Sequence, residues 1–186
     1  MFIQTEETPN PATLKFIPDG QVVVEKGSVE FKNQKQAGAK SPLATQLFEI
    51  SGVEAVFLGH DFITITKSEK TDWQKIKAEI LATIMDFFVT GKSVMFEQKI
   101  AENISTEDSE IVKQIKELIK IKVRPAVAMD GGDIIFHSFE DGIVRLVLKG
   151  SCSGCPSSTI TLKNGIENML KHYIPEVEAV EQVEED

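Results

Sequence analysis

Cysteine is scarce in this sequence, and so are long apolar runs and basic clusters. Only two of the 186 residues are cysteines, Cys152 and Cys155. No uninterrupted apolar stretch approaches the roughly 20 residues that a membrane-spanning helix needs, so we expect no membrane partner. The amino terminus has no basic segment before an apolar run and does not resemble a secretory signal. We expect a cytoplasmic protein of a bacterium, although a mitochondrial matrix protein whose leader has been removed would look the same.

Positive charge is also in short supply. The chain has 20 lysines and arginines against 29 aspartates and glutamates, a net charge of −9. An acidic protein without a clustered basic face repels phosphate backbones, which argues against nucleic acid as a partner. The hydrophobic content of 41% and the charged content of 26% are ordinary for a globular chain with a buried core.

The first half of the chain alternates strand-like and helix-like runs. Strands are expected at residues 13–17, 22–25, 29–31, 53–58 and 62–66. Ser41 and Pro42 suit the cap and first position of a helix over residues 43–50. Thr71 and Gln74 form a candidate capping box for a second helix. Its apolar stripe at helical spacing consists of Trp73, Ile76, Ile80, Ile84, Phe87 and Phe88.

The second half begins with a helix-start pattern at residues 105–108, and Pro125 then argues against further helix. A hairpin of residues 134–139 and 143–148 follows. After the cysteines come another helix and, at residues 177–183, an alternating pattern typical of a strand. The apolar stripes of the two helices are Ile111, Ile115, Leu118 and Ile119, and Leu162, Ile166, Met169, Leu170 and Tyr173.

These patterns predict an α+β fold of two small domains, each a short β-sheet packed with two helices. The carboxy-terminal domain has the element order α-β-β-α-β, with the cysteines between its second strand and second helix. We expect the first domain over residues 1–90 and the second over residues 107–186. Residues 91–106 lack a sustained period and are the expected linker.

The two cysteines share one turn, in the run Gly150-Ser-Cys-Ser-Gly-Cys-Pro156. Gly154 lets the backbone curl, and the three-residue offset lets both sulfurs project to one side. Pro156 suits a helix start, whose unpaired N–H groups would favour the thiolate form that binds metal. The small neighbours would leave both sulfurs accessible.

Such a pair has several possible uses. It can hold a soft metal or an iron–sulfur cluster, or it can cycle through a disulfide as a thiol–disulfide oxidoreductase. A four-cysteine zinc site would need a second CxxC, which the chain lacks, and His60, His137 and His172 show no ligand spacing with the cysteines. Two thiols supply only half of a four-thiolate site, so the other ligands must come from elsewhere, most simply from a second copy of the chain. Two inert structural cysteines are the remaining alternative.

The run Asp130-Gly-Gly-Asp133 can be interpreted in two ways. Its carboxylates could contact a hard metal or a partner. Turn chemistry favours a capped turn instead, in which the glycines permit unusual φ and the aspartates accept hydrogen bonds from nearby N–H groups. Arg124 could pair with a carboxylate of the acidic tail or with another protein.

The run from Gly150 to Thr159, followed by an amphipathic helix, resembles the cysteine motif of the Nfu/NifU carboxy-terminal domain. Arg124-Pro125 followed by Asp130-Gly-Gly-Asp133 is similar to the upstream signature of that family. The first half, from Thr8-Pro-Asn-Pro-Ala-Thr-Leu-Lys-Phe16 onwards, resembles the amino-terminal domain of mitochondrial and α-proteobacterial Nfu proteins.

This resemblance covers almost the whole chain and implies a scaffold or carrier rather than an enzyme. It implies a [4Fe–4S] cluster shared between two chains, with Cys152 and Cys155 as the ligands from each. The expected partners are a second copy of the chain, upstream cluster assembly proteins and apo-enzymes that receive the cluster. The amino-terminal domain has no cysteine, so partner recognition is its expected role. From the residues alone, a CxxC thiol–disulfide oxidoreductase is the main alternative.

Overall fold

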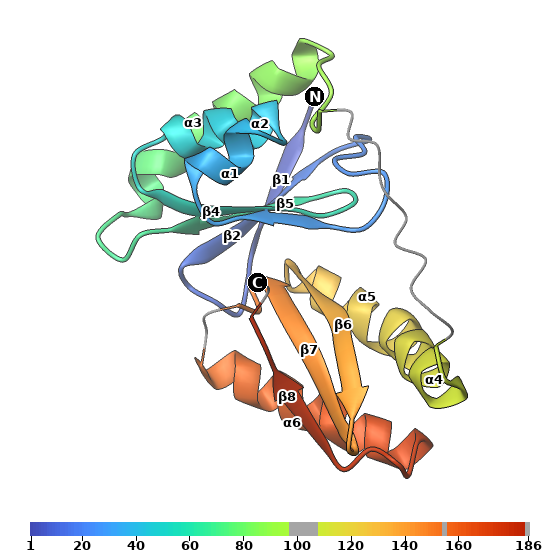
Figure 1. Ribbon diagram of the computed structural model, residues 1–186. Helices are drawn as coiled ribbons and strands as arrows, with labels where there is room; N and C mark the ends of the chain where they lie inside the picture. The colour runs from blue at the N-terminus through green and yellow to red at the C-terminus, as the bar shows by residue number, and fades with distance from the viewer. Residues whose placement is uncertain (97–107, 154–155, 185–186) are drawn as a thin grey trace. The chain divides into compact units, whose positions relative to one another are not determined.

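The computed structural model describes residues 1–96, 108–153 and 156–184. The chain divides into two compact units, Met1–Ile100 and Ala101–Asp186 (Figure 1). Each unit has its own hydrophobic core: one is built from residues up to Met95 and the other from residues after Ile111. The expected linker, residues 91–106, lies mostly outside the described residues, so its boundaries stay a prediction.

The first unit is built on an antiparallel sheet of five strands, with the spatial order β1-β2-β5-β4-β3. The strands are β1 (Ile3–Glu7), β2 (Thr13–Pro18), β3 (Val29–Phe31), β4 (Val53–Leu58) and β5 (Ile63–Lys67). Three helices cover one face of this sheet: α1 (Gln34–Gly38), α2 (Pro42–Glu49) and α3 (Trp73–Val89) (Figure 1).

Helical periodicity in the first unit is confirmed. Ser41 caps α2 by accepting a hydrogen bond from the Ala44 N–H at 3.1 Å, and Pro42 takes the first helical position. The expected stripe of α3 faces the core: Ile76, Ile80, Ile84 and Phe87 are buried, while Trp73 and Phe88 pack against them. The cap of α3 is Asp72, one residue after the Thr71 that we expected.

The strand expected at residues 22–25 does not form. The N–H groups of Val23 and Val24 both donate to the carbonyl oxygen of His60, at 2.7 and 3.3 Å, and this holds the segment as a loop beside the β4–β5 turn. The strand that pairs with β2 in its place is β1, which the sequence patterns did not predict. The five-residue helix α1 was also missed.

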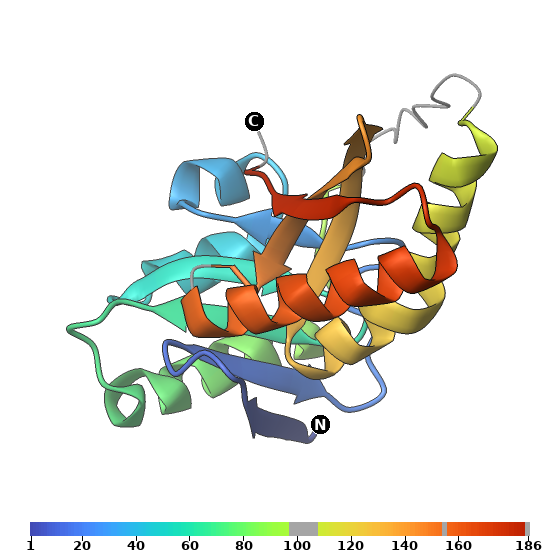
Figure 2. The same ribbon diagram turned by 90° about the horizontal axis from the view of Figure 1, so that it is seen from below.

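The second unit has a sheet of three strands, β6 (Gly132–Glu140), β7 (Ile143–Gly150) and β8 (Ala179–Gln182). Strands β6 and β7 are antiparallel, and β8 runs parallel to β7 because the chain crosses over through helix α6 (Pro156–Tyr173). Figure 2 shows α6 lying across these strands. Helix α4 (Glu110–Leu118) precedes these elements in the chain, so the predicted order α-β-β-α-β and the α+β class are confirmed.

Pro125 does not end the first helix of this unit, contrary to our expectation. Helix α4 continues through a π-helical segment, η1 (Ile119–Val123), into a short helix α5 (Arg124–Met129). Pro125 lies at the start of α5, where its missing N–H costs nothing because the wider π turn has already interrupted the α-helical hydrogen-bond ladder.

The core of the second unit draws on all of these elements. Its buried members include Ile115, Ile119, Val127, Val144, Ile166, Leu170 and Val180. The expected helix start at residues 105–108 lies mostly outside the described residues, and the described cap of α4 is Ser109. Within the described part of the chain, no helix combines the length and the apolar character that crossing a bilayer requires.

Candidate metal-binding site at the cysteine turn

Strand pairing brings the two motifs of the second unit together. In the antiparallel β6–β7 pair, Gly132 lies opposite Gly150, and Asp133 lies opposite Lys149. Residues 130–133, which we call the glycine floor, therefore adjoin residues 150–153, the described part of the cysteine turn (residues 150–155). Runs about 20 residues apart in the sequence thus form one local structure, and neither was expected to support the other.

Hydrogen bonds fasten the cysteine turn to the glycine floor. The Ser151 N–H donates to the Gly131 carbonyl oxygen at 3.2 Å, and the Ser151 hydroxyl donates to the Asp130 carbonyl oxygen. Gly131 and Gly150 have φ of +79° and +67°, conformations that side chains disfavour and glycine adopts freely. Positive φ at both glycines bends the two chain segments toward one another.

The Cys152 sulfur rests directly on Gly132. A Cβ atom at residue 132 would lie 2.7 Å from the Cys152 Sγ and 2.7 Å from the Lys149 carbonyl oxygen. Both distances are far shorter than van der Waals contact, so only glycine fits at this position. The absence of a side chain at residue 132 thus creates the space that the Cys152 sulfur occupies.

Further hydrogen bonds join the cysteine turn to its own backbone, through Ser153, and to α6, through the Cys152 carbonyl oxygen. The Ser153 N–H and hydroxyl both donate to the Gly150 carbonyl oxygen, at 3.1 and 2.9 Å, which closes the turn. The Thr159 hydroxyl donates to the Cys152 carbonyl oxygen at 3.2 Å. Helix α6 begins at Pro156, as the sequence predicts. Gly154 and Cys155 lie outside the described residues.

The prediction that both sulfurs are accessible and favour thiolate is wrong for Cys152. This residue is only 7% exposed and belongs to the apolar core of its unit. Burial raises the pKa of the Cys152 thiol from its ordinary value of 9.0 to about 11. The neighbouring Ser151 hydroxyl opposes this rise in pKa, and the carboxylates of Asp130 and Asp133 add to it. In the described conformation the thiol is therefore neutral at pH 7.

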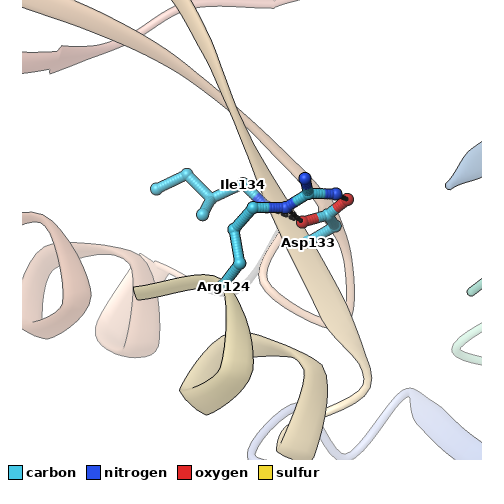
Figure 3. A network of polar contacts seen from close by, with 3 residues as sticks. All are labelled: Arg124, Asp133 and Ile134. Atoms are coloured by element: carbon cyan, nitrogen blue, oxygen red, sulfur yellow. Dashed lines mark hydrogen bonds and ion pairs between the residues drawn. The ribbon is translucent and has the colours of Figure 1, made fainter. Parts of the chain in front are cut away.

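Among the described residues, the carboxylate that pairs with Arg124 is that of Asp133 (Figure 3). The Arg124 Nε and Nη2 atoms donate to the Oδ1 and Oδ2 atoms of Asp133, at 2.8 and 2.7 Å. The Asp133 Oδ1 also accepts the Ile134 N–H at 2.8 Å, which agrees with the expected capped turn. The hydrogen bond to Asp133 raises the pKa of Arg124 above its ordinary value.

The three histidines take part in separate contacts. His60 Nδ1 lies 2.8 Å from the Val24 carbonyl oxygen in the first unit, His137 Nδ1 lies 3.4 Å from the Ser138 hydroxyl, and His172 meets the Tyr173 ring edge-on. Among the described residues, no group of three or more histidines, cysteines, aspartates and glutamates could hold a metal ion.

Sequence reasoning missed the roles of Ser151 and Gly132, and it left the partner of Arg124 open. A signal was available, because extending the predicted hairpin toward its open end places residues near 132 opposite residues near 150. A register shift between Phe136 and Ser138 changes the pairing by one residue along the way, so the exact partners could not be assigned from the sequence.

Comparison with protein families finds two matching family models. One, described as "Scaffold protein Nfu/NifU N terminal", matches residues 3–91. The other, described as "NifU-like domain", matches residues 115–181. The matched ranges fall one in each structural unit.

Full-length likeness is found among curated proteins. A human protein named "NFU1 iron-sulfur cluster scaffold homolog, mitochondrial" is 56% identical over 188 residues, which cover 100% of this chain and 73% of that protein. The protein of the same name from Drosophila persimilis is 52% identical over 190 residues, covering 100% of this chain and 66% of that protein.

Two solved structures are also similar to parts of the chain. The NMR structure of a NifU-like protein from Saccharomyces cerevisiae matches with 31% identity and a TM-score of 0.48, covering 53% of this chain and 87% of that one. A crystal structure of a Staphylococcus aureus protein matches with 22% identity and a TM-score of 0.38, covering 45% of this chain and 99% of that one.

Proposed function

This chain belongs to the Nfu/NifU family of iron–sulfur cluster scaffold proteins, and from that premise we propose that it carries a [4Fe–4S] cluster on Cys152 and Cys155 and transfers it to apo-enzymes. The observation that carries the proposal is the position of the only two cysteines. They stand three residues apart in the sequence, and hydrogen bonds from Ser151 and Ser153 hold the described part of the turn, which contains Cys152. Thiolates are the usual protein ligands of such clusters.

The cluster is shared by two copies of the chain. A cubane cluster takes four thiolates, and each chain offers two. The cluster ligands then hold the pair of chains together, so the protein without cluster need not be a dimer. Sedimentation before and after loading should show the mass doubling with the cluster and returning to the starting value after chelation. A loaded species of single-chain mass would contradict the shared site.

The cluster is cargo in this function. Upstream cluster assembly proteins supply it, and apo-enzymes accept it by offering their own thiolates. The protein itself is not an enzyme in this proposal. We assign cluster loading to residues 107–186, where both thiols lie, and partner recognition to residues 1–90, which contain no cysteine.

Such a cargo requires a reducing compartment, because thiols that are to bind iron must not be oxidised to a disulfide. We therefore propose the mitochondrial matrix or the bacterial cytoplasm. The human and fly relatives carry the word "mitochondrial" in their names, which favours the matrix.

Anaerobic reconstitution with iron and sulfide tests the ligands. The Cys152→Ser and Cys155→Ser variants should each fold and fail to retain iron and sulfide, as measured by metal analysis and visible absorption. The matched control is Ser138→Ala, which removes a hydroxyl from β6 outside the cysteine turn, keeps both thiols and should still load.

The oxidoreductase alternative gives the opposite pattern. It would show a defined dithiol–disulfide potential and reductase turnover in the absence of iron. Normal cluster content in either cysteine variant would also refute the assignment of the two ligands.

A further inference from the structure

We propose that the Arg124–Asp133 ion pair is a positioning device for the cysteine turn, one that sets how firmly the site holds its cluster. The inference rests on the proposed function. It adds two residues that offer no thiolate and are not ligands. They act by fixing the glycine floor, residues 130–133, on which the Cys152 sulfur rests.

The geometry of the pair is suited to fixing a backbone. The guanidinium Nε donates to Oδ1 at 2.8 Å and Nη2 donates to Oδ2 at 2.7 Å, and such a two-point contact between planar groups sets orientation as well as distance. The carboxylate is also held from its own strand by the Ile134 N–H at 2.8 Å. The Asp133 side chain is only 8% exposed, so water does not readily replace the guanidinium.

The pair closes a loop around the glycine floor. At one end of the floor, the N–H groups of Asp130 and Gly131 donate to carbonyl oxygens of α5, at 3.4 and 3.0 Å. At the other end, Asp133 is drawn back to Arg124, the first residue of α5. The floor is thus anchored to one helix at both ends.

The glycine floor contacts the cysteine turn directly. The Asp130 and Gly131 carbonyl oxygens accept the two hydrogen bonds from Ser151, and Gly132 supports the Cys152 sulfur. If the floor shifts, the Ser151 bonds and the position of Cys152 must shift with it. Cluster ligation depends on the positions of the sulfurs, so we expect a loosened floor to shorten the lifetime of the cluster.

Neither Arg124 nor Asp133 is a member of the apolar core of its unit, although their sequence neighbours Val123 and Ile134 are. Removal of the pair should therefore loosen the floor without unfolding the unit. The variants are Arg124→Gln, Asp133→Asn and both together, with Arg124→Lys to keep the charge and lose the two-point contact. The matched control is Arg145→Gln, which removes contacts to Glu140 and Glu181 on the same sheet, away from the floor.

Amide hydrogen exchange of the protein without cluster is the first readout. The Ser151 N–H reports on the floor, and the Val183 N–H, which donates to the Leu146 carbonyl oxygen at 2.9 Å, reports on the rest of the sheet. We expect Ser151 exchange to quicken by about tenfold in Arg124→Gln, the scale of one charge-assisted hydrogen bond, with Val183 unchanged. Arg124→Lys should fall between this variant and the parent, and Arg145→Gln should match the parent.

The rate of iron loss to a chelator is the second readout, and it should rise in the same order of variants. Unchanged Ser151 exchange, equal quickening of both amides, or unchanged iron loss despite faster Ser151 exchange would each overturn the proposal. If the parent protein loads no cluster, the proposed function fails, while the Ser151 readout still decides whether the pair fixes the floor.

Discussion

Cys152 shows how a single side chain can be a candidate ligand and a core residue together. Its sulfur lies on Gly132, among apolar neighbours, and burial raises the pKa of the thiol from 9.0 to about 11. A metal binds the thiolate, so loading must supply the free energy that separates the buried thiol from an exposed thiolate. The bond between iron and the thiolate would supply this free energy, and a movement of the turn that exposes the sulfur would reduce the amount needed.

This pKa predicts the pH dependence of Cys152 reactivity. In a Cys155→Ser variant, the alkylation rate by iodoacetamide should rise with pH to a midpoint near 11 in the folded protein, and near 9.0 in urea. Because the thiol pKa is higher in the folded state, the contribution to stability is complete below pH 9.0 and is lost as the pH rises toward 11. A folded-state midpoint at or below that measured in urea would contradict the burial of the sulfur.

Gly132 gives a steric prediction at the same scale. In Gly132→Ala the new methyl group would lie 2.7 Å from the Lys149 carbonyl oxygen, a backbone atom that cannot turn aside, and 2.7 Å from the Cys152 Sγ. We expect a loss of about 1–3 kcal/mol in the free energy of unfolding, measured in urea, together with weaker cluster retention.

The control for Gly132→Ala is Gly165→Ala. Gly165 lies in α6 with nothing within 4 Å of an added Cβ, so this variant should gain about 0.5–1 kcal/mol. Equal stability changes in the two variants would show that Gly132 is not sterically confined.

At the scale of the elements, Glu167 joins α6 to the edge strand β8. Its Oε2 accepts the Val180 N–H at 3.0 Å, and its Oε1 accepts a hydrogen bond from the Lys171 Nζ at 2.7 Å. The Lys171 ammonium and then the Val180 N–H hold the pKa of the Glu167 carboxyl below its ordinary value. The Glu167 side chain thus links β8 to α6, the helix of the crossover between β7 and β8.

The Glu167 contact should be lost in acid. A carboxyl whose pKa is depressed by folding stabilises the protein above its unfolded-state pKa, and the contribution disappears as the pH falls through the folded-state value. Glu167→Ala should therefore lower the free energy of unfolding near pH 7, by up to about 1 kcal/mol because solvent screens the Glu167–Lys171 pair. The difference in free energy between the variant and the parent protein should shrink below about pH 4.

Urea unfolding of Glu167→Ala between pH 3 and pH 7 measures this difference. The control is Glu110→Ala, since Glu110 pairs with Lys113 of the same helix at 3.1 Å and has an 84% exposed side chain. A Glu167→Ala difference that persists unchanged at pH 3 would show that lost packing, and not the charge, causes it.

The elements that the sequence predicted are those with a sustained period. The stripe of α3 and the β4–β5 and β6–β7 hairpins alternate long enough to fix their type. Strand β1 was missed because Ile3 is its only buried residue and its other side chains are polar. The loop at residues 22–25 has apolar side chains typical of a strand, but its N–H groups bind a single carbonyl oxygen of His60.

The candidate site was predictable in its chemistry and not in its support. Two cysteines three residues apart predict the ligands without any coordinates, and this assignment stays a prediction. The contact between Cys152 and Gly132 depends on strand register, and the pairing of Arg124 depends on a π-helical segment that continues the helix past the point where Pro125 suggested an end. Neither feature has a local sequence signal.

At the scale of the whole molecule, the two units have separate cores. Among the described residues, none of the first core follows Met95 and none of the second precedes Ile111. A unit with its own core is expected to fold alone. Both thiols lie in the second unit, and the turn residues Ser151 and Cys152 contact Asp130, Gly132 and Thr159 of that same unit.

A fragment that begins near Ser105 should therefore fold and load the cluster as the full chain does. Its iron and sulfide content and its absorption spectrum after anaerobic reconstitution measure this. Failure of a folded fragment to load would show that the first unit helps to build the site.

Transfer of the cluster to client apo-enzymes tests the role of the first unit. If residues 1–90 select partners, the fragment and the full chain should transfer at different rates to some clients and at equal rates to others. The comparison is made at equal cluster content. The control acceptor is a small dithiol chelator, which needs no recognition and should withdraw iron from both at one rate. Equal transfer rates for every client would remove the recognition role, whereas a uniform difference that extends to the chelator would mean that the first unit protects the cluster.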